Sequence, residues 1–529
     1  MAMTSRKVGL FLVATLVAFA SLGVRASAQG LPPVQKPFEP KVPQGTYGCS
    51  IHKSCADVAP TIIKNALGPS PIETNLRVLT DEIGGRVTGS PAAEKAVDWA
   101  VDAFRQAGVD EVLTENFTLP AGWAEGRTHL TVLSPEPFPV HLVSMGWSPA
   151  TPEGGLTADV IDVGTGQESD FEHAGESVKG AILLVHTDVL QTWDDLFNEY
   201  LYEPAVEQRA IDAGASAILW MSTRPYLLLY RHIFSQDGTI DRLPQAIVAR
   251  EDALRMARLI AAGQAVKVNL DMANKISGQT ASENVVAEIR GSEKPDEFVI
   301  LAAHLDSWEL GTGALDNGCN AAMVIDAARA IRASGSIPRR SIRFVLFTGE
   351  EQGMLGSWAY ALAHRAELDK MDAAIVFDAG DGRVTGYSLG GRKDIADAMD
   401  QALKPLATFG PLKNTADVEI GTDNFDFLLE GVPTLIANQD SDDYMMNYHA
   451  FSDTFDKVDF AQLKKNEAIA AVTAYSVADM PDRLGIRQTR SQIERLMKET
   501  GMEKQLKRMG LWEMWADGKR GRQPETPAH

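Results

Sequence analysis

Imidazole and carboxylate side chains directly follow three apolar segments of the chain. These polar residues are His304 and Asp306, Glu350 and Glu351, and Asp378. Two further segments add Asp316, which follows a glycine-rich turn, and the neighbours Tyr448 and His449. An imidazole and several acids at the ends of buried strands are costly unless a strong partner satisfies them, and a metal ion is such a partner. The pattern therefore predicts a metal centre.

The mixture of ligand types indicates which metal is bound and how many ions there are. Two histidines with several carboxylates suit zinc or a similar divalent ion, whereas an all-oxygen set would suit magnesium or calcium. The number of candidate ligands exceeds the needs of one tetrahedral site. It fits two ions that share a bridging carboxylate. We therefore expect two metal ions per chain.

The elements that must position these residues alternate between strands and helices. Strand-like segments are expected at 284–289, 298–303, 342–347 and 373–377, with a helix at 320–333. This alternation predicts an α/β fold with a mostly parallel central sheet covered by helices. In such sheets ligands bind at the carboxyl ends of the strands, where the charged motifs lie. Short apolar runs and helical stretches also alternate within 127–276, which predicts an inserted, smaller α/β domain.

The remaining parts of the chain lie before and after the expected catalytic domain, which we place at 57–126 and 277–485. Residues 1–28 combine a positive start, an apolar core and a small-x-small motif. They predict a signal peptide and export to the periplasm or the outside of the cell, with an uncleaved anchor as the alternative. Residues 29–56 form a proline-rich leader, and residues 486–529 form a charged helical tail.

Cysteine usage follows from the predicted export. Cys49 and Cys55 lie close together in the leader. In an oxidising compartment they either close a small disulfide loop or remain thiols. Cys319 lies in the motif region and is expected to be a small buried residue.

Composition and charge limit the classes of partner. The 529 residues are 45% hydrophobic and 23% charged, which is typical of a globular protein rather than a disordered one. The formal net charge of −21 repels nucleic acid phosphates and anionic lipid, so neither is expected as a partner. After the signal segment no run reaches the roughly 18 apolar residues of a membrane span. We therefore expect no membrane association once the signal is cleaved.

Taken together, the motifs resemble those of the co-catalytic di-zinc exopeptidases, a family that includes secreted bacterial aminopeptidases and carboxypeptidase Q. The resemblance extends over the expected catalytic domain. The triplet Asp306-Ser307-Trp308 and the stretch Phe377-Asp378-Ala379-Gly380 are most similar to the carboxypeptidase Q branch. The segment 127–276 is similar to the protease-associated domain that this branch carries.

The resemblance implies a ligand set for two zinc ions. His304 and Asp378 would hold one ion, and Glu351 and His449 would hold the other. Asp316 would bridge the two. Short peptides would be the substrates, and the resemblance leaves a homodimer open.

The resemblance also implies roles for residues around the metals. Glu350 would be the general base that takes a proton from the attacking water and returns it to the departing amine. Asp306 would accept a hydrogen bond from the first imidazole and fix its tautomer. Tyr448 either donates a hydrogen bond to the developing oxyanion or packs beside His449. Asp453 either orients His449 or caps a turn.

The leading functional hypothesis is an exported zinc peptidase that cleaves at the ends of short peptides or dipeptides, as an aminopeptidase, a dipeptidase or a carboxypeptidase Q-like enzyme. One alternative is a catalytically inactive interaction protein on the same fold, although such a protein would be expected to lose ligands. Another is a single-zinc aminoacyltransferase similar to glutaminyl cyclase. The segment 423–427 departs from the family pattern, so substrate specificity is not carried over from the resemblance.

Overall fold

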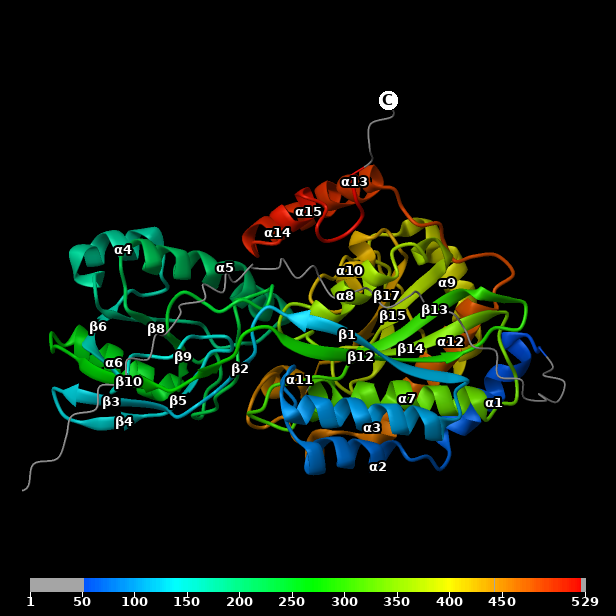
Figure 1. Ribbon diagram of the computed structural model, residues 1–529, viewed down its shortest axis with the longest axis horizontal. Helices are drawn as coiled ribbons and strands as arrows, with labels where there is room; N and C mark the ends of the chain where they lie inside the picture. The colour runs from blue at the N-terminus through cyan, green and yellow to red at the C-terminus, as the bar shows by residue number, and fades with distance from the viewer. Residues whose placement is uncertain (1–51, 442, 525–529) are drawn as a thin grey trace, which may run out of the picture. The chain divides into compact units, whose positions relative to one another are not determined.

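The main sheet is centred on four apolar strands that are buried on both faces. The computed structural model describes residues 52–441 and 443–524. In it, four strands pair in parallel (Figure 1): β14 (Arg340–Phe347), β13 (Lys294–His304), β15 (Met371–Val376) and β17 (Thr434–Gln439). Burial of both faces explains why these segments are nearly continuous apolar runs. The strands predicted at 298–303, 342–347 and 373–377 are thus confirmed, with ends that differ by a few residues, whereas β17 was not predicted.

The outer strands of this sheet pair antiparallel. On one side the sheet continues with β12 (Thr280–Ile289) and β1 (Glu111–Leu119), and on the other side with β16 (Val384–Ser388). The predicted α/β fold is confirmed, but parallel pairing is confined to the four central strands. Strand direction depends on the path of the chain between elements, and the residue pattern within a strand does not encode that path.

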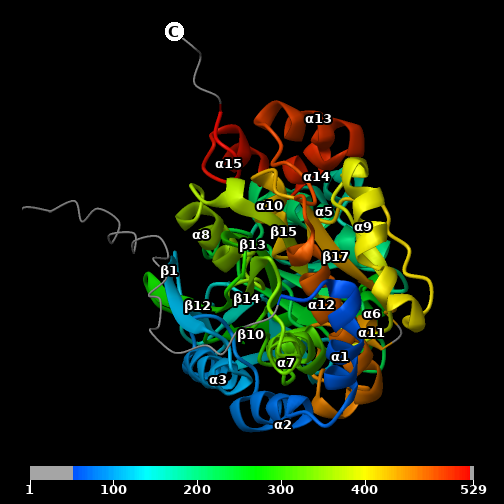
Figure 2. The ribbon, with the colours of Figure 1, turned by 90° about the vertical axis from the view of Figure 1, so that its right-hand side faces the viewer.

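Helices cover both faces of the main sheet (Figures 1 and 2). One face carries α1 (Cys55–Leu67), α3 (Pro91–Ala107), α7 (Cys319–Arg332) and α12 (Phe460–Asp479). The other carries α8 (Leu355–Ala363) and α10 (Asn424–Leu429). Helix α7 is buried almost all round because it contacts β13 and β14 as well as α1, α3 and α12. Its burial places the turn that precedes it, Ala314–Gly318, firmly at the end of the sheet.

A second sheet is formed by segments between residues 128 and 272. On one side of its parallel centre, β10 (Lys267–Met272) and β3 (Thr128–Ser134) pair antiparallel. Its parallel centre consists of β6 (Leu156–Asp162), β7 (Ile182–Val185), β8 (Ala217–Met221) and β9 (Gln245–Val248). Helices α5 (Trp193–Asp212) and α6 (Arg250–Ala261) accompany this sheet. One apolar cluster consists only of its own residues, and a second also includes Ala450 of the main body.

The C-terminal segment packs on the main body through a buried ion pair. Helices α13 (Arg490–Thr500), α14 (Met502–Arg508) and α15 (Trp512–Ala516) precede Arg520, which is 1% exposed. Its guanidinium donates to both carboxylate oxygens of Asp426 in α10, at 2.8 and 2.9 Å, and to the carbonyl of Gly353 at 3.0 Å. The bidentate contact joins the tail to α10, and the bond to Gly353 joins it to the segment that follows β14.

Breaking this ion pair is expected to destabilise the protein strongly. Arg520→Met removes the partner of a buried carboxylate, a change that costs about 3–5 kcal/mol in comparable pairs. Thermal unfolding followed by circular dichroism measures the effect. The matched control is Lys507→Met, which removes a largely exposed ion pair with Glu503 in α14 and is expected to change the melting temperature little. Equal melting temperatures for the two variants would contradict the prediction.

Several predictions about the chain ends fall outside the part that is described. The signal peptide at 1–28, most of the leader at 29–56 and Cys49 lie outside the described residues. Cys55 is buried at the start of α1, and its pairing with Cys49 stays a prediction. Within residues 52–441 and 443–524, no helix is both long enough and apolar enough to span a bilayer.

Candidate metal centre

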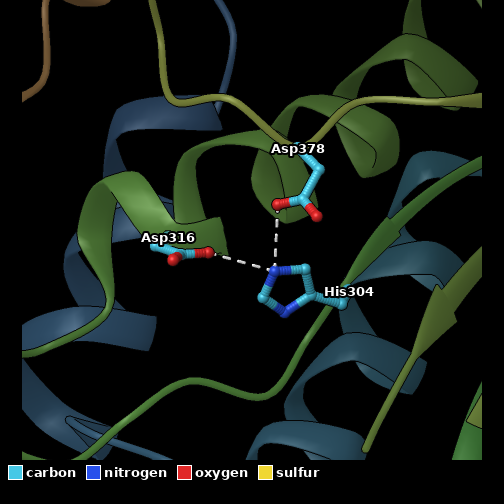
Figure 3. A group of neighbouring side chains, drawn as sticks. All are labelled: His304, Asp316 and Asp378. Carbon is cyan, nitrogen blue, oxygen red and sulfur yellow. Dashed lines mark hydrogen bonds and ion pairs between the residues drawn. The ribbon is translucent and has the colours of Figure 1, made fainter. Parts of the chain in front are cut away.

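The first group of predicted ligands meets at the carboxyl ends of β13 and β15 (Figure 3). His304 is the last residue of β13, and Asp378 lies just after β15. The Nε2 atom of His304 lies 3.1 Å from Oδ1 of Asp316 and 3.1 Å from Oδ1 of Asp378. One imidazole nitrogen and two carboxylate oxygens therefore converge, with all ligand atoms within 4.8 Å of one another.

A second group shares Asp316 with the first. The Nε2 atom of His449 lies 2.9 Å from Oε2 of Glu351 and 3.3 Å from Oδ2 of Asp316. The two carboxylate oxygens of Asp316 thus face different groups, as a bridging ligand requires. All five residues predicted as metal ligands are brought together in these two groups.

The far nitrogen of each imidazole donates to a backbone carbonyl. Nδ1 of His304 lies 3.1 Å from the carbonyl oxygen of Asp306 and 3.5 Å from its carboxylate. Nδ1 of His449 lies 3.0 Å from the carbonyl oxygen of Arg231, which belongs to the inserted segment, between β8 and β9. These hydrogen bonds assign the proton to Nδ1 and leave Nε2 facing the acids, as a metal-ligating imidazole needs.

The carboxylate of Asp306 accepts hydrogen bonds from groups other than the His304 imidazole. It accepts a hydrogen bond from the hydroxyl of Thr88 at 2.7 Å and from the backbone N–H of Glu350 at 3.4 Å. The expected hydrogen bond from the His304 imidazole goes to the Asp306 carbonyl, which is the nearer acceptor. Asp306 therefore links the end of β13 to the turn that carries Glu350.

Asp453 positions the bridging residue instead of the second imidazole. Its carboxylate accepts hydrogen bonds from the backbone N–H groups of Ala314, Leu315 and Asp316, at 3.0, 2.6 and 3.1 Å. The alternative that Asp453 orients His449 is wrong, because the carbonyl of another segment occupies that place. The alternative of a capping acid is the one that the structure supports, with the turn at Asp316 as its target.

Arg86 is a supporting residue that the sequence pattern did not reveal. It is buried, and its guanidinium donates to the carbonyls of Leu305, Thr312 and Gly313, the last two at 2.8 and 2.9 Å. Five donors in one planar group let a single arginine hold both ends of the glycine-rich loop. Arg86 lies more than 200 residues before this loop, and no spacing rule connects the two.

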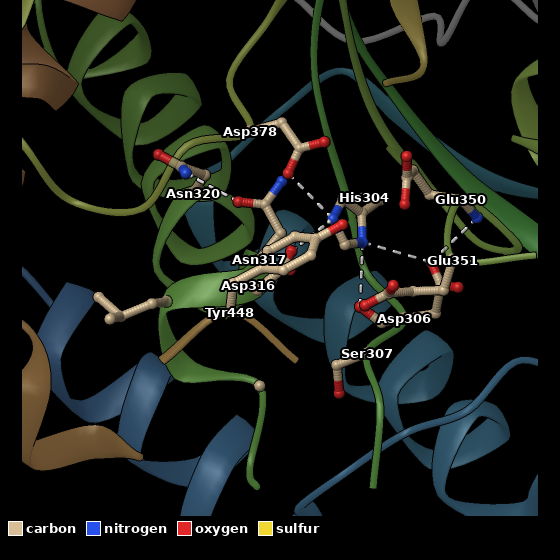
Figure 4. A network of polar contacts seen from close by, with 12 residues as sticks. His304, Asp306, Ser307, Asp316, Asn317, Asn320, Glu350, Glu351, Asp378 and Tyr448 are labelled. Atoms are coloured by element: carbon tan, nitrogen blue, oxygen red, sulfur yellow. Dashed lines mark hydrogen bonds and ion pairs between the residues drawn. The ribbon is translucent and has the colours of Figure 1, made fainter. Parts of the chain in front are cut away.

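Glu350 and Glu351 leave the same turn after β14 and face different surroundings (Figure 4). Glu351 reaches His449, whereas Glu350 lines a cavity beside the two ligand groups. The backbone N–H groups of Gly353 and Met354 both donate to the carbonyl of Glu350 at 2.8 Å, which closes the turn. The neighbouring acids are thereby held in separate positions.

The electrostatics of the cluster fit a divalent cation. Burial raises the pKa of Glu350 well above the usual carboxyl range and raises the pKa of Glu351 to about 7. Burial disfavours the charged form of His449, but the Glu351 carboxylate outweighs it and raises the imidazole pKa to about 10. Among the described residues, the buried Oε1 atom of Glu351 has no hydrogen-bond partner. Such crowded acids gain stability when a cation binds between them.

The cavity beside the ligand groups has one acidic and one apolar side. Its acidic residues are Asp316, Glu350, Glu351 and Asp378. Its apolar residues include Trp193, Leu196 and Phe197 of α5, together with Met354, Ile420 and Met509. Among the described residues that line this cavity, none is a lysine or an arginine. The site can therefore accommodate an apolar group next to a positively charged one.

Comparisons with known proteins agree with this fold. Residues 284–474 match the model of peptidase family M28. Carboxypeptidase Q of Mus musculus is 31% identical over 77% of this chain and 86% of its own length. A peptidase M28 precursor from Shewanella amazonensis is 29% identical, with a TM-score of 0.74 over 82% of this chain and 99% of its own. A zinc aminopeptidase from Bacillus subtilis, 19% identical, shares the fold with a TM-score of 0.62 over 79% and 97% of the two chains.

The chain therefore belongs to peptidase family M28. It is a metallopeptidase, a hydrolase that acts on peptide bonds. The family membership predicted from the motifs is confirmed.

Proposed function

We propose that this protein is an exported two-zinc exopeptidase that cleaves short peptides next to a free amino terminus. The observation that carries the proposal is the shared carboxylate of Asp316, which has one oxygen in each of two ligand groups. Export rests on the signal pattern at 1–28, and we further propose that 127–276 is a protease-associated-like domain inserted into the catalytic domain.

The residues present suit zinc. His304 and Asp378 would hold one ion, Glu351 and His449 the other, and Asp316 both, a mixed nitrogen and oxygen set that zinc accepts. When bound, the ions supply Lewis-acid activation of water and of the scissile carbonyl.

The proton transfers are assigned to residues of the chain. Glu350 lies in the cavity without a role in either ligand group, so it is free to act as the general base. A carboxylate at this position can take up a proton from the attacking water and return it to the leaving amine. Tyr448 lines the same cavity and is placed to donate a hydrogen bond to the substrate's carbonyl oxygen.

The charge of the cavity supports the choice of substrate terminus. With zinc bound, three of the four acids would serve as ligands, so the choice rests on the absence of lysine and arginine among the described lining residues, which leaves a substrate carboxylate without a basic partner. A substrate with a free amino terminus needs no such partner, and its first side chain would lie against the apolar residues.

Metal analysis together with a peptide panel tests the proposal. Purified protein is expected to contain two zinc ions per chain and to hydrolyse unblocked dipeptides and aminoacyl-amides in a chelator-sensitive reaction. N-acetylated versions should be poor substrates, and equal cleavage of them would overturn the choice of terminus. One zinc with cyclisation of N-terminal glutamine would support the aminoacyltransferase instead. Absence of both metal and hydrolysis would support an inactive protein.

Phe197 in α5 is expected to contribute to side-chain selectivity. Phe197→Ala widens the apolar side of the cavity, so the ratio of kcat/KM for leucyl over alanyl substrates should fall on the order of tenfold, a typical effect for lost apolar contact. The control is Tyr226→Ala, which also truncates an aromatic side chain of the inserted segment, but one that is 88% exposed. An unchanged ratio in Phe197→Ala would remove this residue from the substrate pocket.

A further inference from the structure

The hydroxyl group of Tyr448 is held by a residue of the inserted segment. Its oxygen lies 2.8 Å from the hydroxyl oxygen of Tyr200, which belongs to α5. The ring of Tyr448 also stacks on the imidazole of His449, with centroids 3.6 Å apart and an interplanar angle of 21°. Stacking fixes the plane of the phenol, and the contact with Tyr200 adds a partner for its hydroxyl.

Tyr200 is itself fixed by buried neighbours. The imidazole of His232 packs edge-on against its ring, with centroids 4.6 Å apart. The Nε2 atom of His232 lies 3.1 Å from a carboxylate oxygen of Glu203, which follows Tyr200 by three residues on α5. His232 and Glu203 are both buried. The ring of Tyr200 is therefore packed against buried residues of the inserted segment itself.

The inserted segment is also joined to the chain next to Tyr448. The backbone N–H of Arg231 donates to the carbonyl of His449 at 2.9 Å, and the imidazole of His449 donates back to the Arg231 carbonyl at 3.0 Å. Tyr230 and Ala450 form an antiparallel bridge alongside. These contacts hold the inserted segment against residues 449–450, next to Tyr448.

Two phenol hydroxyls in contact can be oriented so that one of them remains free to donate a hydrogen bond to the substrate. A phenol hydroxyl donates one hydrogen bond and accepts others. If Tyr200 donates to Tyr448, the proton of Tyr448 is left for the substrate's carbonyl oxygen, and accepting a hydrogen bond makes Tyr448 a stronger donor. Burial raises the pKa of the Tyr200 phenol well above its usual range, so Tyr200 stays protonated and can act as a hydrogen-bond donor.

We propose that Tyr200 is a positioning residue that orients the Tyr448 hydroxyl for oxyanion stabilisation, so that the inserted segment supplies part of the catalytic apparatus. This inference rests on the proposed function. It gives the insertion a role in the chemical step in addition to its contribution to the cavity wall.

A double-mutant cycle with the full-length protein and the dipeptide panel tests the inference. Tyr448→Phe removes the donor and is expected to lower kcat by about 10²–10³-fold. Tyr200→Phe keeps that donor but removes its partner, so we expect a smaller fall in kcat, on the order of tenfold, with KM nearly unchanged. The double variant should be no slower than Tyr448→Phe alone, because Tyr200 acts only through Tyr448.

The control variant is Tyr202→Phe, which removes a hydroxyl from the same helix at a side chain that is 51% exposed. It should retain the wild-type kcat. Metal content and melting temperature, measured for every variant, should be those of the wild type. Wild-type kcat in Tyr200→Phe, or losses that multiply in the double variant, would overturn the inference. Absence of hydrolysis by the wild-type protein would instead overturn the proposed function.

Discussion

Glu350→Gln is expected to lower kcat by about 10²–10⁴-fold, the usual contribution of a positioned general base. Glutamine has nearly the same shape, but its amide replaces one acceptor oxygen by a donor and cannot take up the proton of the attacking water at neutral pH. Because Glu350 lies outside both ligand groups, the variant should retain the wild-type metal content. Steady-state kinetics on the best dipeptide and metal analysis of the same sample measure the two effects.

The adjacent residue provides a matched control. Glu351→Gln makes the same chemical change one position further along, but it weakens a predicted ligand that lies 2.9 Å from His449. We therefore expect Glu351→Gln to lose metal as well as activity. Wild-type turnover in Glu350→Gln would show that another group is the base. Loss of metal from Glu350→Gln would show that the two glutamates do not have separate functions.

His304→Ala is expected to lose at least one of the two metal ions and nearly all activity. The imidazole supplies the single nitrogen of the first ligand group, and its removal leaves two carboxylates whose charges repel each other. Wild-type protein should be stabilised by added zinc, by about 2.7 kcal/mol at a free concentration 100 times the Kd. The variant should show a much smaller stabilisation. Metal content per chain and melting temperature with and without zinc check this expectation.

His364→Ala is the control for a histidine that is buried among acids away from the site. His364 is 4% exposed, and its Nε2 atom lies 2.9 Å from a carboxylate oxygen of Glu115. It belongs to neither ligand group, so its replacement should reduce thermal stability without changing the number of metal ions per chain. Equal metal contents in the two histidine variants and the wild type would contradict the assignment of His304 as a ligand.

The candidate ligands were predictable because their chemistry is unusual for their position. His304 and Asp378 lie at the ends of apolar runs, where burying a polar or charged group costs free energy unless that group has a partner. The carboxyl ends of parallel strands meet at one edge of a sheet, so residues far apart in sequence were expected to converge there. The structure brings them together within hydrogen-bonding distance of one another.

The supporting contacts were less predictable. Asp453 lies four residues after His449, and this proximity suggested a direct contact that the fold does not make. Its carboxylate turns to the backbone of the segment 314–316. Sequence spacing indicates which residues are near each other along the chain, but the direction of a side chain in a loop depends on the segments packed around it.

The sequence by itself determined the family, the chemical class of the site and the identity of the candidate ligands, because residue types at strand ends reflect local chemical requirements. Only the tertiary structure decided which groups surround those ligands. Arg86 supports the loop before Asp316 and Tyr200 approaches Tyr448, each from more than 200 residues away. Such contacts arise from the packing of whole elements against one another, and no local pattern of residues records them.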